Sequence, residues 1–236
     1  IALLAGNQVI WADEGASLIA HYDFNNITNN TVSDKSGLYD AKLVGATVVD
    51  GLLDKAISIN GAAGAAKGSE NVSRLEVPDA VFSKVTDWSI AILVKSEGQN
   101  LNTAVITWGV YFNQDGPFIN IWFNHESNQN AGIHVAIQPR NGTRLHGRAA
   151  ADDYIKADSN YYWFIITQQG SVVKAYIDSK NVITMNNVNV TAADLLAGNE
   201  NNIIAIGSSV IFPDPAPKCI IDDVRFYNGA LSENQI

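Results

Sequence analysis

The sequence predicts an all-β protein, an antiparallel sandwich of two sheets with at most one or two short helices. Three observations predict it: apolar residues alternate along short runs, turn residues separate the runs, and no long helical period occurs. Residues 88–95 show this alternation, with Trp88, Ile90, Ile92 and Val94 on one face. About ten such runs without intervening helices favour a sandwich or jelly roll over a parallel α/β fold.

The individual elements follow from the same pattern. We expect further strands at residues 17–24, 56–59, 74–77, 104–108, 118–123, 132–138, 161–168, 172–177, 203–207 and 220–227. Gln169 and Gly170 predict one hairpin turn, and residues 178–181 predict a second one before Val182. One short helix is expected at residues 191–197, capped by Thr191.

Length and composition indicate one domain. The chain has 236 residues, of which 47% are hydrophobic and 17% are charged, and this supplies enough apolar material for one two-layer core. We place the domain at residues 15–236 because no repeat or linker interrupts them. Residues 1–14 have two interpretations, the end of a signal peptide or an N-terminal edge strand of the mature domain.

Charge and cysteine content exclude several classes of partner. The net charge is −9 and no cluster of Lys and Arg is evident, which argues against nucleic acid and anionic membrane surfaces. No apolar stretch reaches the roughly 18 residues of a membrane-spanning helix. The single cysteine, Cys219, cannot form an intrachain disulfide and is expected to be a small buried hydrophobe. An exported protein without disulfides points to bacteria.

Residues 18–25 resemble the opening strand of laminin-G-like, concanavalin A-like domains of the bacterial kind often attached to glycoside hydrolases. The resemblance continues in order along the chain, through residues 31–37, 56–61, 75–78, 87–95, 162–167, 174–178, 203–207 and 221–227. Each motif alone is weak, but their order and spacing together are specific. The resemblance covers residue 17 to the end, except for residues 98–155, where little can be matched.

The resemblance implies a structural calcium ion. In the family fold the first and last strands lie side by side, which would bring together Asp23, Asn25, Asp222 and backbone carbonyls of residues 36–38. Calcium takes six to eight oxygen ligands of these kinds. The alternative is that both aspartates are solvated or capping residues at strand ends.

No catalytic arrangement is evident. Sandwich-fold glucanases place two carboxylates on alternate residues of one strand, and no Glu-x-Asp-x-Glu pattern occurs here. The pairs Asp152–Asp153 and Asp222–Asp223 are adjacent, and adjacent strand residues are expected to point to opposite faces. The four histidines lack metal-ligand spacing. We therefore expect a domain that is not an enzyme, with a hydrolase or lyase of unrecognised site as a further alternative.

Aromatic residues of the divergent region supply the binding signal, because sugar rings stack on aromatic rings while amides bind hydroxyl groups. The expected ligand-binding residues are Trp122, Trp108, Tyr111, Asn120 and Asn124. Residues 119, 121 and 123 alternate toward the core, which sends Asn120, Trp122 and Asn124 to the opposite face. There Trp122 is either a binding platform or a residue packed under a loop.

Together these features predict a non-catalytic, lectin-like carbohydrate-binding module of a secreted or cell-surface bacterial protein. Its partners would be a glycan or polysaccharide and other domains of the same polypeptide, which would be a larger glycoside hydrolase or adhesin. The alternative is a structural or protein-interaction domain without sugar affinity, since fold does not fix function.

Overall fold

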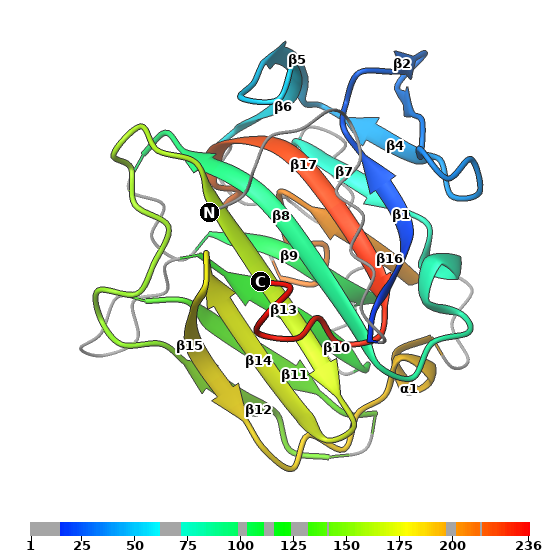
Figure 1. Ribbon diagram of the computed structural model, residues 1–236, viewed down its shortest axis with the longest axis vertical. Coiled ribbons are helices and arrows are strands. Elements are labelled where there is room, and N and C mark those ends of the chain that lie inside the picture. Colours follow the sequence, from blue (N-terminus) through cyan, green and yellow to red (C-terminus); the bar gives the residue numbers. More distant parts are fainter. Residues whose placement is uncertain are drawn as a thin grey trace.

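The chain folds as two antiparallel β-sheets stacked face to face, with the core between them (Figure 1). The computed structural model describes residues 15–61, 72–98, 103–110, 116–123, 132–140, 142–196, 202–212 and 214–236. Residues 1–14, for which a signal-peptide remnant or an edge strand was expected, lie outside the described residues. Within the described part, no helix is long and apolar enough to cross a membrane.

One sheet is centred on the strand β17 and is called the β17 sheet. From edge to edge it contains β15 (Lys180–Met185), β14 (Val172–Ile177), β13 (Tyr162–Gln169), β8 (Trp88–Ser96), β17 (Lys218–Asn228), β6 (Lys55–Asn60) and β5 (Thr47–Asp50). The first strand, β1 (Ser17–Tyr22), pairs with β17, and Tyr22 lies opposite Val224. The expected neighbourhood of the first and last strands is thus confirmed.

The facing sheet is called the β10 sheet. From edge to edge it contains β12 (Leu145–Arg148), β11 (His134–Gln138), β10 (Phe118–Trp122), β9 (Ala104–Val110), β16 (Asn202–Ile206), β7 (Arg74–Val77), β4 (Ala41–Val44), β3 (Thr31–Val32) and β2 (Ile27–Thr28). A 3-10 turn, η1 (Asp79–Phe82), and the short helix α1 (Ala192–Leu196) complete the described elements. The all-β fold class predicted from the sequence is confirmed, with α1 inside the predicted helical segment.

Four short strands, β2 to β5, and the edge strand β12 were not predicted from the sequence. The sequence of β12 is Leu-His-Gly-Arg, which carries no apolar alternation because the strand is half exposed at a sheet edge. β12 lies beside β15, the edge strand of the other sheet (Figure 1). Gly147 permits this approach, because a Cβ atom there would lie 2.7 Å from side-chain atoms of Ile183 and Met185.

A β-bulge in β17 changes the expected direction of one acidic pair. Ile221 and Val224 both pack in the core, and the register against β8 shifts between Ile221 and Asp223. A bulge inserts one extra residue into the strand, here Asp222. Asp222 and Asp223 therefore both leave the core side, and the expectation that they point to opposite faces is wrong.

Aromatic side chains fill the centre of the core. Phe82, delivered by η1, stacks on Trp108 with ring centroids 4.7 Å apart and also contacts Trp88 at 5.6 Å and Phe226 at 5.5 Å. All four side chains are buried, and they come from both sheets and from the turn between β7 and β8. Cys219 is buried in the same core, as its sequence context predicted.

Replacing Phe82 by alanine is expected to lower the free energy of unfolding by about 3–5 kcal/mol, because it leaves a cavity between the sheets. The matched control is Leu38→Ala. Leu38 is 74% exposed, and its replacement should change the same quantity by at most about 0.5 kcal/mol. Denaturant unfolding followed by tryptophan fluorescence measures both variants, and equal effects would contradict the central role of Phe82.

Candidate functional site

The strand β10 separates core residues from outward residues as the sequence predicted. Ile119, Ile121 and the following Phe123 belong to the main core. Phe118 and Trp122 belong to a second apolar cluster on the opposite, outer face of the β10 sheet. Because side chains alternate along a strand, Asn120 shares that outer face. The outward positions of β10 thus hold no carboxylate, which agrees with the absence of a Glu-x-Asp-x-Glu pattern.

A segment of the chain's own sequence covers part of this outer face. Residues Ser208–Phe212, here called the covering segment, pack Val210 and Ile211 against Phe118 and Trp122. Alanines at 104, 136 and 205 in the underlying strands leave room for them. As a result, Trp122 is only 6% exposed. The structure therefore places Trp122 beneath this segment and does not present it as an open platform.

Three rings stack in a row across strands β10, β11 and β12. Trp122 stacks on His134 at 4.7 Å with an interplanar angle of 15°, and His134 stacks on His146 at 5.1 Å and 19°. The rings of His134 and His146 also meet through Nε2 and Nδ1, which lie 2.9 Å apart. His134 is buried, whereas His146 is exposed. The row thus links a buried indole to a histidine at the surface.

The indole of Trp122 is also held by a carboxylate. Trp122 Nε1 donates a hydrogen bond of 3.0 Å to Asp214 Oδ2, just beyond the covering segment. Burial raises the pKa of Asp214, although the hydrogen bond from Trp122 acts in the opposite direction. The negatively charged form of Asp214 is therefore less stable in this site, which is partly shielded from solvent, than it would be in water.

Buried polar groups lie under the covering segment. Asn120 is fully buried, and its Oδ1 accepts hydrogen bonds from Thr107 Oγ1 at 2.5 Å and from Ser209 Oγ at 3.4 Å. Among the described residues, Asn120 Nδ2 and Ser208 Oγ have no hydrogen-bond partner. A buried donor without a partner costs about 1–3 kcal/mol. These two groups on the outer face can each form a further hydrogen bond.

The other predicted ligand-binding residues lie elsewhere. Trp108 pairs with Ile119 across β9 and β10 and faces the core, where it is 1% exposed. This position differs from the expected ligand contact, because a ring stacked on Phe82 inside the sandwich presents no face to a sugar. Tyr111 and Asn124 lie outside the described residues.

The outer face of the β17 sheet carries a second group of aromatic and charged residues. Arg225 lies over the ring of Trp163 at 5.2 Å and binds Asp223 through Nε at 2.7 Å and through Nη2 at 3.1 Å. His21 Nε2 lies 2.8 Å from the same carboxylate. The C-terminal residues Leu231 and Ile236 pack onto this face. Trp163 is half-buried on this face.

The predicted calcium ligands have other partners in the structure. Burial alone would raise the pKa of Asp23, but its hydrogen bonds from Lys35 and from the Asn25 N–H hold that pKa below its usual range. The Lys35 ammonium lies 2.7 Å from Asp23 Oδ2. Asn25 Oδ1 accepts from the N–H of Lys55 at 3.1 Å. No three His, Cys, Asp or Glu side chains gather as a metal site in the described ranges.

Asp222 contacts the turn between β5 and β6, and Asn25 contacts Lys55, the first residue of β6 after that turn. The carboxylate of Asp222 accepts hydrogen bonds from the backbone N–H groups of Leu52 and Leu53. Burial raises the pKa of Asp222, and the nearby carboxylates of Asp223 and Asp54 add to the increase against these two hydrogen bonds. Asp222 thus binds the turn and Asn25 the start of β6 that follows it, whereas Asp23 is engaged by Lys35.

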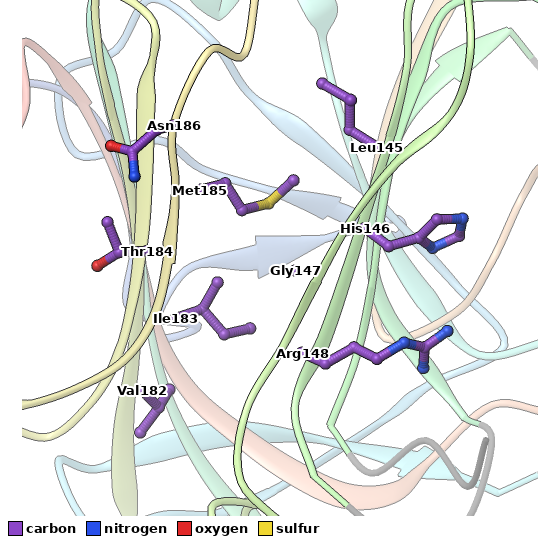
Figure 2. A pocket seen from close by; sticks show the side chains of 9 residues that line it. All are labelled: Leu145, His146, Gly147, Arg148, Val182, Ile183, Thr184, Met185 and Asn186. Atoms are coloured by element: carbon purple, nitrogen blue, oxygen red, sulfur yellow. The ribbon is translucent and has the colours of Figure 1, made fainter. Parts of the chain in front are cut away.

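A pocket of about 340 Å³ opens between the neighbouring edge strands β12 and β15. Figure 2 shows Ile183 and Met185 between the two strands, while His146 and Arg148 point away from them on the β12 side. The polar side chains of β12 therefore belong to the outer face of the β10 sheet, beside the row of stacked rings.

Comparison with known proteins agrees with this architecture. Residues 69–236 match the family model described as the concanavalin A-like lectin/glucanases superfamily, of the laminin G type. No curated protein matches the sequence significantly. Domain 4 of AbnA, a GH43 extracellular arabinanase from Geobacillus stearothermophilus solved with arabinotriose, is similar with a TM-score of 0.70 and 23% identity, covering 94% of this chain and 97% of that domain.

Two larger proteins contain a similar fold as one part. The binding domain of botulinum neurotoxin DC, solved with rat synaptotagmin II, has a TM-score of 0.61 and 15% identity, and 49% of it is covered by 93% of this chain. Trypanosoma rangeli sialidase has a TM-score of 0.61 and 13% identity, and 31% of it is covered by 92% of this chain. At these identities the likeness concerns the fold.

The substitution Asp214→Asn is expected to raise the free energy of unfolding at neutral pH, because it keeps an acceptor for Trp122 and removes a buried charge. The raised pKa of Asp214 means that protonation relieves the wild-type protein as pH falls. The difference between variant and wild type should therefore shrink in acid. Denaturant unfolding of both proteins at neutral and at acidic pH measures this difference. Asp214→Ala, which removes the acceptor, should be less stable than Asp214→Asn, and the reverse order would contradict this account.

Proposed function

Because the chain belongs to the concanavalin A-like lectin/glucanase superfamily, we propose that it is a non-catalytic carbohydrate-binding module of a secreted or cell-surface bacterial protein. The observation that carries the proposal is the similarity to an arabinanase domain that holds arabinotriose, since each chain covers nearly the whole of the other. The parent polypeptide would be a larger glycoside hydrolase or an adhesin. That arabinanase is extracellular, which supports export.

The outer face of the β10 sheet is the proposed sugar-binding surface. At its β12 edge this face exposes the imidazole of His146, at the end of the stacked row, and the guanidinium of Arg148, and such rings and hydrogen-bond donors bind sugar faces and hydroxyl groups. Phe118, Asn120 and Trp122 occupy the outward positions of β10, so this strand presents no carboxylic acid of the kind that retaining and inverting glycosidases use. This chemistry supports binding without hydrolysis.

Calorimetric titration with arabinan, arabino-oligosaccharides and a panel of plant and host polysaccharides tests the proposal. Trp122→Phe should weaken binding about three- to tenfold, because it preserves a ring but removes the hydrogen bond to Asp214 that helps to hold the stacked row in place. The control is Trp163→Phe, an equivalent change on the outer face of the β17 sheet. Loss of binding in Trp163→Phe alone would instead place the sugar-binding site on the β17 sheet. The absence of binding to every polysaccharide at millimolar sugar would refute the proposal.

One observation favours a second candidate, a structural or protein-interaction domain without sugar affinity. The covering segment buries Asn120 and Trp122 with its own aliphatic side chains, which occupy space that a sugar would need. Under this alternative the outer face is internal packing, and the domain serves as a spacer or adhesion module. The same titrations separate the two candidates, because the alternative predicts no heat of binding with any glycan.

We further propose that Asp222 and Asn25 hold a structural calcium ion. Burial raises the pKa of Asp222, with smaller contributions from the carboxylates of Asp223 and Asp54, and a divalent cation beside Asp222 would stabilise its ionised form. Carboxylate and amide oxygens are the ligands that calcium prefers. Asp23 would join them only if the ion displaced the Lys35 ammonium.

Calcium at a concentration about 100-fold above its dissociation constant should raise the melting temperature by roughly 5–10 °C over that in chelator. Asp222→Asn keeps acceptors for the Leu52 and Leu53 N–H groups and should abolish the calcium response. Magnesium serves as the ion control, because it demands a smaller octahedral site. A melting temperature unaffected by calcium and by chelator would rule the site out.

A further inference from the structure

Three basic side chains line the β12 edge of the outer face. His146 and Arg148 are alternate residues of β12 and point to the same side, and Arg144 directly precedes the strand, with its guanidinium over Phe118 of the outer face. Figure 2 shows His146 and Arg148 directed to one side of β12, away from β15. Across the sheet, Arg148 lies opposite His134, the middle ring of the stacked row. The three side chains therefore continue the outer face to its exposed edge.

Packing holds Arg144 in place. Its guanidinium lies over the rings of Phe118 at 5.0 Å and Phe212 at 5.2 Å, and its Nε donates to Gln138 Oε1 at 3.3 Å. In the part of the chain that the structure describes, no carboxylate forms an ion pair with Arg144. A guanidinium stacked on aromatic rings loses little conformational freedom on binding an anion. Arg144 is thus a preorganised cation beside the covering segment.

His146 is exposed and has a fixed ring orientation, because it stacks on His134 and meets it through Nδ1. Burial lowers the pKa of His146, and the positive charges of Arg148 and Arg144 lower it further. The positive charges of both arginines are thus close enough to affect the imidazole of His146. The exposed side chain of Arg148 completes an array that follows the strand, with about 6.6–6.8 Å between alternate residues.

This array contrasts with the rest of the protein. The net charge is −9, and three of the five arginines lie between residues 140 and 148. Sequence inspection for adjacent basic residues misses the array because its members alternate with Leu145 and Gly147. A guanidinium donates two parallel hydrogen bonds to a carboxylate or sulfate, and an extended polymer with regularly spaced acidic groups could contact several members at once.

We propose that Arg144, His146 and Arg148 form a binding site for an acidic glycan, one whose sugars carry carboxylate or sulfate groups. This inference rests on the proposed carbohydrate-binding function and names its ligand class. His146, the exposed end of the stacked row, offers a ring to the sugar, while the basic side chains bind the acidic groups. A small array on an acidic protein suits such a polymer better than nucleic acid, whose binding needs more extensive positive charge.

The test titrates the whole chain with two matched pairs of polymers. Polygalacturonate is compared with its methyl ester, and dextran sulfate with dextran, so that each pair differs only in charge. Wild type should bind at least one acidic polymer at least tenfold more tightly than its neutral counterpart. Preference for polygalacturonate assigns the site to carboxylates, and preference for dextran sulfate assigns it to sulfates.

Variants locate the site. Arg144→Gln with Arg148→Gln should weaken binding of the acidic polymer at least tenfold. Lys84→Gln with Lys174→Gln removes the same charge, from a residue that follows η1 and its cap Ser83 and from β14, and should leave binding within twofold. Melting temperatures verify that the variants are folded. If loss of the Arg144 packing prevents folding, the exposed Arg148→Gln alone should still weaken binding at least threefold.

Several results would overturn the proposal. Wild type could bind neither acidic polymer, the arginine variants could bind as wild type does, or duplex DNA could bind as tightly as the glycan, which would show unspecific attraction of polyanions. Binding of arabinan or another neutral polysaccharide without preference for acidic polymers would refute this inference and leave the proposed function standing. Binding of no glycan at all would refute both.

Discussion

The position of β17 inside its sheet is the constraint on which the architecture depends. β17 pairs with β8 along one side and with β6 and then β1 along the other, so it joins the two ends of the chain to its middle. Cys219 and Ile221 face the core before the bulge, and Val224 and Phe226 face it after the bulge. The strand can therefore cover the whole core with apolar side chains only because the bulge resets its alternation.

That bulge has an electrostatic consequence. It directs two successive carboxylates away from the core, and each must be stabilised separately. Arg225 and His21 surround Asp223, which forms a buried charge cluster on the outer face. Within the described ranges, Asp222 accepts hydrogen bonds from backbone N–H groups of the β5–β6 turn, and burial raises its pKa. Asp223 lies between two basic side chains, whereas Asp222 binds backbone N–H groups. This difference makes a cation beside Asp222 physically reasonable.

One part of the outer face of the β10 sheet is buried by packing, and another part is exposed to solvent. Small residues beneath the covering segment admit Val210 and Ile211, so the middle of the face is closed by the chain itself. Toward β12 the same face becomes polar and exposed, through His146 and Arg148. The stacked rings of Trp122, His134 and His146 connect the two parts. The proposed ligand binding on this face therefore concerns its β12 edge, with the buried tryptophan as support.

Alternation and turn residues were sufficient to predict the sandwich, most long strands, the short helix and the direction of Ile119, Ile121 and Trp122, because these follow from the geometry of a single strand. Which outward residues stay accessible depends on contacts between distant segments. Trp108 and Trp122 belong to similar apolar runs, yet register places one in the core and the other under residues 208–212. Likewise, Asp222 and Asp223 diverge from simple alternation only through pairing with β8. Local sequence therefore determined the strands and their two faces, whereas tertiary structure alone decided which face is covered, since the covering residues lie far away along the chain.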